Sequence, residues 1–228
     1  MRPVVEVLES GRRKVFEIID AVGNEEVAKA ASARGVEVKR TSRQRVEELA
    51  RGEVHQGVTA HVEPYPYSGL GEILSAPEPL VLVLDSVTDP RNLGAVLRAA
   101  DGAGACGVVI PKDRAVGVTA AAVKASAGAS EHVRVARVTN LRRAVDTMKE
   151  AGLWIYAAER GGTPYTELDL AGAVALVLGS EGRGMRRLVR EGCDGTVSVP
   201  MLGAVESLNV SVACAVLLYE ARRSRGWP

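Results

Sequence analysis

The sequence predicts an α/β protein built mainly on a Rossmann-like, largely parallel β-sheet covered by helices. Six apolar runs follow one another in the second part of the chain, at residues 81–84, 108–110, 133–138, 154–158, 174–178 and 197–199. Helical patterns separate most of them, at residues 92–102, 119–127 and 141–151. Strands buried on both faces read as continuous apolar runs, and their alternation with helices is typical of parallel sheets.

A smaller α/β unit is expected before this sheet, over residues 1–63. Its expected elements are a helix over 24–34, a strand over 36–39, a helix from Thr41 to near Gly52 and a strand over 57–62. Asn24 is a typical N-cap for the first helix, and Thr41 with Gln44 forms a capping-box pattern at the start of the second. The unit is small, so we expect it to pack against the second domain or a partner chain.

A linker is expected between the two units, at residues 64–79. This segment contains four prolines and two glycines, and it follows neither a helical nor a strand period. Such a composition favours extended or turning backbone. We therefore divide the chain into domains at residues 1–63 and 80–228.

The composition is that of a folded, soluble protein, with 46% hydrophobic and 25% charged residues. No apolar run approaches the roughly 20 residues that cross a bilayer, so we expect no membrane contact and a cytoplasmic location. Cys106, Cys193 and Cys214 lie far apart, without a paired-cysteine motif or a histidine at ligand spacing. They predict buried thiols in a reducing compartment, with neither a disulfide nor a metal site.

Two local clusters of basic residues are candidates for phosphate contact, because the net charge is only +1. The first cluster contains Arg34, Lys39, Arg40, Arg43 and Arg45, and the second contains Arg183, Arg186, Arg187 and Arg190. Each cluster either contacts nucleic acid or forms an ordinary solvated surface. Aromatic residues make up 4% of the chain, so base-stacking platforms are not expected outside Tyr65 and Tyr67.

Three polar motifs each follow an expected strand. They read Asn92-Leu-Gly-Ala-Val-Leu-Arg98, Leu178-Gly-Ser-Glu-Gly-Arg-Gly184 and Val199-Pro-Met-Leu-Gly-Ala-Val-Glu-Ser-Leu-Asn-Val-Ser211. Open α/β sheets bind ligands at the carboxyl edge, where such loops lie. The glycines of the second motif let main chain approach a ligand closely. The motif is neither a phosphate loop nor a dinucleotide fingerprint, which argues against ATP and NAD.

Together the three motifs resemble the signature motifs of the SpoU family, which are TrmH-type RNA 2'-O-ribose methyltransferases of the SPOUT superfamily. The resemblance covers about residues 79–224 and is nearest to bacterial 23S rRNA guanosine 2'-O-methyltransferases. It implies S-adenosyl-L-methionine (SAM) as cofactor, an RNA substrate, a homodimer and no metal. It also implies a C-terminal trefoil knot, which the residue pattern alone does not predict because connections rarely thread loops.

The same resemblance implies roles for individual residues. The implied catalytic residues are Asn92, Arg98, Glu181, Ser207 and Asn209. The implied cofactor-binding residues are Leu178, Gly179, Gly182, Val199, Pro200, Met201 and Leu208. The structural alternatives are that Asn92 caps a helix, that Arg98 is a surface residue, and that Ser207 caps a helix over 207–223.

Arg98 matches the arginine that is placed at the ribose 2'-hydroxyl in this family and has been proposed there as a general base. A guanidinium has an unperturbed pKa above about 12 and is hard to deprotonate. We therefore favour a role in which Arg98 donates hydrogen bonds to the hydroxyl oxygen or a flanking phosphate and stabilises the developing alkoxide.

The first unit resembles the L30e-like domain that precedes the catalytic domain in these rRNA methyltransferases. The matching segments are Gly11-Arg-Arg-Lys-Val15 and Val54-His-Gln-Gly-Val58. His55 in the second segment is expected either to contact RNA or to have a structural role. The main functional alternatives are a tRNA ribose or an antibiotic-resistance site in rRNA as the target. A non-catalytic, RNA-binding ribosome-assembly factor is the alternative from another class of protein.

Overall fold

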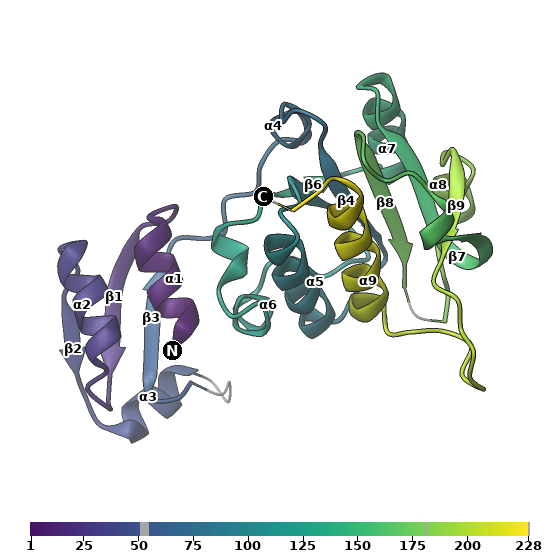
Figure 1. Cartoon of the computed structure of the whole chain (residues 1–228). Coiled ribbons are helices and arrows are strands. Elements are labelled where there is room, and N and C mark those ends of the chain that lie inside the picture. The colour runs from purple at the N-terminus through teal and green to yellow at the C-terminus, as the bar shows by residue number, and fades with distance from the viewer. Residues whose placement is uncertain (51–54, 181, 228) are drawn as a thin grey trace.

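A computed structural model describes residues 1–50, 55–180 and 182–227, which form two α/β units joined by a short connection (Figure 1). The first unit contains a three-stranded sheet in the order β2-β1-β3, and the second contains a six-stranded sheet in the order β6-β5-β4-β8-β7-β9. Every strand pair of the larger sheet is parallel. The expected α/β class with a mainly parallel sheet is therefore confirmed.

The first unit packs two helices against one face of its sheet. Its elements are α1 (Arg2–Ser10), β1 (Val15–Asp20), α2 (Glu25–Ala33), β2 (Val38–Arg40), α3 (Arg43–Ala50) and β3 (Val58–Val62). Its core contains Leu8, Ile18, Val27 and Val58. The central strand, β1, was not expected, because Glu17 and Asp20 interrupt its apolar pattern. Helix α3 begins later than expected.

The helix starts of this unit test the two capping expectations. The Asn24 side chain accepts a hydrogen bond from the Val27 N–H at 2.9 Å, which confirms Asn24 as the N-cap of α2. At α3 the expectation was wrong, because Ser42 Oγ, rather than the Thr41 side chain, accepts the hydrogen bond from the Arg45 N–H. Serine and threonine are chemically equivalent caps, so local sequence does not separate the two positions.

Asp20 holds the turn between β1 and α2 together. Its buried carboxylate accepts hydrogen bonds of 2.8 Å from the backbone N–H groups of Val22, Gly23 and Asn24, and it contacts Arg40. Burial works to raise the pKa of Asp20, but these hydrogen bonds and the Arg40 charge outweigh it and hold the pKa below its usual value. The ionised carboxylate therefore stabilises the fold.

We expect Asp20→Asn to lower the free energy of unfolding at neutral pH by about 1–3 kcal/mol, because an amide cannot accept at both positions. The contribution of a carboxyl with a lowered pKa is present above its unfolded pKa, about 3.9, and disappears as the pH falls through the folded value. The difference between wild type and variant should therefore shrink below about pH 4. Urea denaturation across pH measures it, with the exposed Asp113→Asn as control. Equal stability at neutral pH would contradict this role.

The second unit matches the expected strands. Its elements are β4 (Leu80–Asp85), α5 (Pro90–Gly102), β5 (Gly107–Pro111), α6 (Ala120–Ala125), β6 (Val135–Val138), α7 (Leu141–Glu150), β7 (Trp154–Pro164), β8 (Val174–Gly179), α8 (Arg187–Arg190), β9 (Gly195–Ser198) and α9 (Val210–Ser224), with 3₁₀ turns at Ala129–Glu131 and Tyr165–Glu167. All six apolar runs coincide with strands. The segment predicted as a linker, residues 64–79, contains a short helix that was not predicted, α4 (Leu70–Leu74).

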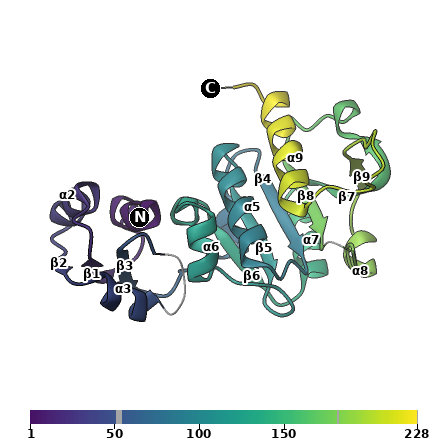
Figure 2. The same ribbon diagram turned by 90° about the horizontal axis from the view of Figure 1, so that it is seen from below.

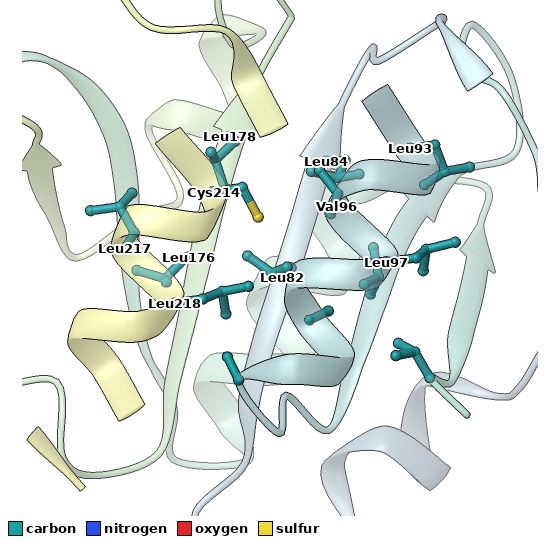
Figure 3. Packing of buried hydrophobic residues seen from close by; sticks show 14 of the residues in the cluster. Leu82, Leu84, Leu93, Val96, Leu97, Leu176, Leu178, Cys214, Leu217 and Leu218 are labelled. Atoms are coloured by element: carbon teal, nitrogen blue, oxygen red, sulfur yellow. The ribbon is translucent and has the colours of Figure 1, made fainter. Parts of the chain in front are cut away.

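Helices cover both faces of the larger sheet. Helices α5 and α9 lie side by side on one face (Figure 1, Figure 2), where Leu82 and Leu84 of β4 pack with residues of both helices. Figure 3 shows Leu93, Val96 and Leu97 of α5 and Cys214, Leu217 and Leu218 of α9 around β4 and β8. Helices α4, α7 and α8 pack on the opposite face, against Val81 and Val83.

Gly94 in the first motif is a packing residue. A Cβ at this position would lie 2.4 Å from the Ala125 Cβ and 2.6 Å from the Ala122 carbonyl oxygen. The close approach of α5 and α6 therefore requires glycine here. This contact fixes the helix that carries the rest of the motif.

Buried polar contacts join the two units. The Arg13 guanidinium forms an ion pair with Glu131, and the two side chains are only 8% and 0% exposed. Arg12 donates to the Val133 carbonyl at 3.0 Å and lies 5.1 Å from the centre of the Tyr65 ring. Burial raises the pKa of Tyr65 to about 12. Because Tyr65 is buried in this joint, it is not one of the aromatic residues available for base stacking.

Candidate functional site

A cleft of about 600 Å³ opens where β8, β9 and the start of α9 meet. Its lining includes most of the predicted cofactor-binding residues, namely Leu178, Gly179, Gly182, Val199, Met201 and Leu208, together with the predicted catalytic residue Ser207. Small-molecule sites usually have volumes of about 300–1,000 Å³. Segments that are distant in sequence thus form one cleft of suitable size. The exposed Pro200 does not line it.

The loop after β8 folds back tightly on the end of its strand. The backbones of Ser180 and Gly184 exchange hydrogen bonds of 3.1 and 2.9 Å. A Cβ on Gly179 would lie 2.3 Å from the Gly184 carbonyl carbon and 2.4 Å from the Met185 nitrogen. Because backbone atoms cannot yield as a flexible side chain does, only glycine fits there. The predicted catalytic Glu181 lies outside the described residues.

Asp85 anchors this loop to the end of β4, and the sequence analysis missed it. Its buried carboxylate accepts hydrogen bonds from the Arg186 backbone N–H at 2.8 Å and from Arg186 Nε at 2.7 Å. Ser86 Oγ donates to the same carboxylate at 2.9 Å. The available signal was an acidic residue at the end of an otherwise apolar strand, since a buried charge needs a partner.

The loop after β9 leads into α9 and carries the third motif. Asn209 Oδ1 accepts a hydrogen bond from the Ser211 N–H at 2.9 Å, so the N-cap of α9 is Asn209. The alternative that Ser207 caps this helix was therefore wrong, and Ser207 instead stands exposed at the cleft. An ion pair between Glu206 and Arg160 of β7 ties the loop to the opposite wall.

The first and third motifs meet through their asparagines. Asn209 Nδ2 donates to Asn92 Oδ1 at 3.0 Å. Asn92 lies within the first turn of α5, whose N-cap is Asp89, so the alternative that Asn92 caps the helix was wrong. Two predicted catalytic residues, separated by more than a hundred positions, are therefore in direct contact beside the cleft.

Arg98 lies away from the cleft of its own chain. It is exposed on α5, and none of the described residues that line the cleft comes from that helix. Arg98 is one helical turn before Gly102, where a Cβ would lie 2.8 Å from the Tyr219 Oη of α9. Arg98 therefore borders the outer surface formed by α5 and α9.

Most members of the two basic clusters are engaged within the protein. Arg186 binds Asp85, Arg187 binds Glu191 at 2.6 Å, and Arg190 makes two 2.7 Å hydrogen bonds to Glu159. Arg34 donates to the Leu8 carbonyl, and Lys39, Arg40 and Arg45 pair with Glu17, Asp20 and Glu48. Helix α8 is also too short to align the second cluster on one face. These contacts favour the structural alternative for both clusters.

His55 has a structural environment. Its side chain is 8% exposed, Nδ1 accepts a hydrogen bond from the Gly57 N–H at 3.0 Å, and Nε2 lies 3.2 Å from a Glu47 carboxylate oxygen. Both ring nitrogens are therefore engaged within the unit. This favours the structural alternative for His55 over direct RNA contact.

The described residues offer no metal centre. No group of three or more histidine, cysteine or acidic side chains among them could hold an ion. The cysteines are free thiols, and burial raises the pKa of Cys193 to about 11. No helix in the described part of the chain is long and apolar enough to span a membrane.

Comparison with known sequences finds two family matches that together span most of the chain. Residues 79–219 match the SpoU rRNA Methylase family. Residues 1–68 match a domain described as RNA 2'-O ribose methyltransferase substrate binding. These two matched segments correspond to the units with the larger and the smaller sheet.

Curated relatives and solved structures agree with these matches. The putative TrmH family tRNA/rRNA methyltransferase YacO of Bacillus subtilis is 42% identical, over 97% of this chain and 93% of its own length. The 23S rRNA (guanosine-2'-O-)-methyltransferase RlmB of Escherichia coli K12 is 46% identical, over 86% and 83%. The structure of the SpoU methyltransferase AviRb from Streptomyces viridochromogenes with the cofactor AdoMet has a TM-score of 0.82 at 27% identity, covering 98% and 88%. An AdoMet-bound rRNA methyltransferase from Sinorhizobium meliloti has a TM-score of 0.83 at 28% identity, covering 98% and 85%.

Proposed function

Because this chain belongs to the SpoU rRNA methylase family, we propose that it methylates the ribose 2'-hydroxyl of a guanosine in 23S rRNA, in the cytoplasm. Membership of the family makes the chain an RNA 2'-O-methyltransferase that uses SAM. The choice of a 23S rRNA guanosine is supported by the 46% identity to RlmB over 86% of the chain. The observation that carries the proposal is that the second and third motifs line one cleft and that Asn92 of the first motif contacts Asn209 beside it.

The cleft is suited to the cofactor. Its apolar lining from Val199, Leu208 and Leu217 can pack against an adenine ring. Gly179 and Gly182 line the cleft, and neither has a side chain that would keep a ligand from approaching the main chain. We therefore assign the binding of SAM to the predicted cofactor residues that line the cleft, and Pro200 contributes only through the course of the loop.

When bound, SAM would supply the methyl group of its sulfonium. The ribose 2'-oxygen would bond to the methyl carbon as the carbon–sulfur bond breaks, S-adenosylhomocysteine would leave, and the hydroxyl proton would pass to water. The Asn92–Asn209 hydrogen bond fixes two amides beside the cleft, where they can orient the incoming 2'-hydroxyl. Ser207 stands exposed at the mouth and can accept or donate a hydrogen bond to the same group. Arg98 lies away from the cleft of its own chain, so in this proposal the Arg98 of a second copy stabilises the negative charge that develops on the ribose oxygen. Glu181 completes the proposed set.

A homodimer that pairs the outer surfaces of α5 and α9 accounts for the position of Arg98. Val212 and Tyr219 of α9 are 48% and 44% exposed, although large apolar side chains usually lie inside. Leu202 and Val205 in the preceding loop are even more exposed. A second copy packed on this face would cover these side chains and enclose the neighbouring Arg98.

We expect Val212→Asp to raise the dimer dissociation constant by at least about tenfold, because it would bury an unpaired charge in the interface. Sedimentation velocity over a concentration series measures this change. Val22→Asp is the matched control, since Val22 is 51% exposed but lies in the first unit. A wild-type monomer, or a variant that dimerises as tightly as wild type, would contradict the proposed interface.

Transfer of a labelled methyl group tests the function. The protein is incubated with methyl-labelled SAM and either 23S rRNA from a strain lacking the gene or bulk tRNA, and the RNA is digested to nucleosides. The proposal predicts label in 2'-O-methylguanosine from 23S rRNA. Label in tRNA alone would show that the substrate is a tRNA ribose and not 23S rRNA. RNA binding without transfer to any RNA would favour the ribosome-assembly factor.

A further inference from the structure

The first unit exposes the chain's single phenylalanine. Phe16 is 50% exposed, although phenylalanine is among the residues most often buried. It lies on β1 near the end of the sheet from which the linker leaves, whereas α3 lies at the opposite end (Figure 1). Among described residues, the core of this unit forms without Phe16. Its position is therefore not explained by packing of the unit.

A β-bulge presents Phe16 at the surface. In the pairing of β1 with β3, Val15 is opposite Val62 and Glu17 is opposite His61, so that Phe16 is the extra residue between them. A bulge of this kind redirects the side chain and is often found beside functional sites. The local backbone thus holds the ring in a defined orientation.

An aromatic and a cationic group accompany the ring. The exposed His61 ring lies 5.1 Å from the Phe16 ring centre, tilted by 44°. The ammonium of the exposed Lys14 lies 5.3 Å from the same ring. The two tilted rings, with the Lys14 ammonium over the Phe16 ring, form an exposed aromatic and cationic group that we call the Phe16 platform.

The surroundings of the platform favour an anionic ligand. Two carboxylates lie near the platform. Glu63 accepts a hydrogen bond from the Lys14 backbone N–H at 3.1 Å, and Glu17 forms an ion pair with Lys39 at 2.5 Å, which compensates the charge of Glu17. A hydrogen bond from Lys39 holds the pKa of Glu17 below its usual value, with smaller contributions from the charges of His61 and Arg45. The Lys14 ammonium is therefore not cancelled by this carboxylate. A ligand with a π-face and an adjacent negative charge is complementary to such a surface.

We propose that the Phe16 platform binds an unpaired nucleotide of the RNA substrate, with its base stacked on Phe16 in place of the Lys14 side chain and its phosphate bound by the Lys14 ammonium. This inference rests on the proposed function, which supplies RNA as the substrate. Unpaired bases are commonly recognised by stacking on phenylalanine or histidine, whereas bases inside a duplex are not accessible. The platform would select a looped or bulged region of RNA and hold it against the first unit.

Fluorescence anisotropy with the full-length protein tests this proposal. The probes are an RNA hairpin with an unpaired loop and the same hairpin with its loop paired to a complementary strand. Loss of one base stack weakens binding by about 5- to 150-fold. Phe16→Leu, which keeps an apolar side chain but removes the aromatic face, should weaken binding to the open hairpin in this range. Phe16→Trp should retain it. Trp154→Leu, at an exposed aromatic residue of the other unit, is the matched control.

A fluorescent base in the loop separates stacking from an effect on folding. We expect 2-aminopurine in the loop to be quenched by wild type, Phe16→Trp and Trp154→Leu, but not by Phe16→Leu. Equal binding of Phe16→Leu and wild type to the open hairpin would overturn the proposal. So would failure of the wild type to prefer the open hairpin, or a change of oligomeric state in Phe16→Leu, which would place Phe16 in a subunit contact.

The proposed function is tested separately on the same proteins, by calorimetric titration with SAM and by methyl transfer to 23S rRNA. A wild type that transfers methyl groups while Phe16→Leu keeps full RNA affinity would refute the platform alone. A wild type that binds the open hairpin but neither binds SAM nor transfers methyl groups to 23S rRNA would refute the proposed function. RNA binding by the platform would then remain intact.

Discussion

Arg98→Ala is expected to lower kcat/KM for methyl transfer by about 100- to 1,000-fold, as is usual when a group that stabilises developing oxyanion charge is removed. The affinity for SAM should be unchanged, because Arg98 is exposed on α5 and does not line the cleft of its own chain. Single-turnover transfer and calorimetry measure the two quantities separately. A parallel loss of SAM affinity would show that Arg98 acts on the cofactor site instead.

Two further variants define the role of Arg98. Arg98→Lys keeps the positive charge but loses the planar, bidentate donor geometry. If Arg98→Lys is faster than Arg98→Ala, the difference in rate between these two variants is due to the positive charge. Arg143→Ala removes an exposed arginine from α7 on the opposite face of the sheet and should leave the rate unchanged. Wild-type activity in Arg98→Ala would contradict the proposed role.

Gly179→Ala is expected to weaken SAM binding by about tenfold or more, since overpacking a rigid site costs about 1–3 kcal/mol. The added Cβ would meet backbone atoms of Gly184 and Met185 at 2.3–2.5 Å, so that the loop must move away from the end of β8. Calorimetric titration of the folded variant with SAM measures the effect.

Gly203→Ala provides the matched control for this substitution. Gly203 lies in the loop of the third motif, and a Cβ there would meet nothing within 4 Å. It should therefore bind SAM as the wild type does. If Gly179→Ala also bound SAM normally, the loop after β8 would not form part of the cofactor site.

The strands of the larger sheet were predictable because burial on both faces leaves a continuous apolar run, as in β4 and β8. The smaller sheet was harder, since charged residues interrupt the central strand β1. The short helix α4 was not predicted, because a segment rich in proline and glycine indicates turns. Such a composition does not exclude a single helical turn. The trefoil knot stays a prediction that rests on the family resemblance.

The lining of the cleft was predictable where the position in a motif decides it, as for Gly179 and Leu208, which both line the cleft. The partners of charged side chains were not, because tertiary packing decides them. Arg186 illustrates this difference, since its sequence neighbours suggest a basic surface whereas the fold places it against the buried Asp85. The position of Arg98 away from the cleft was equally invisible in the sequence, because tertiary packing decides which face of α5 is turned toward the cleft.

A crystal structure of the protein with S-adenosylhomocysteine would test the central claim most directly. The account predicts that the ligand lies in the cleft between β8, β9 and the start of α9, with its adenosine held by main chain near Gly179 and Leu208 and its sulfur facing the Asn92–Asn209 pair. A ligand bound instead at the ends of β4 and β5, as in an ordinary nucleotide-binding sheet, would contradict it.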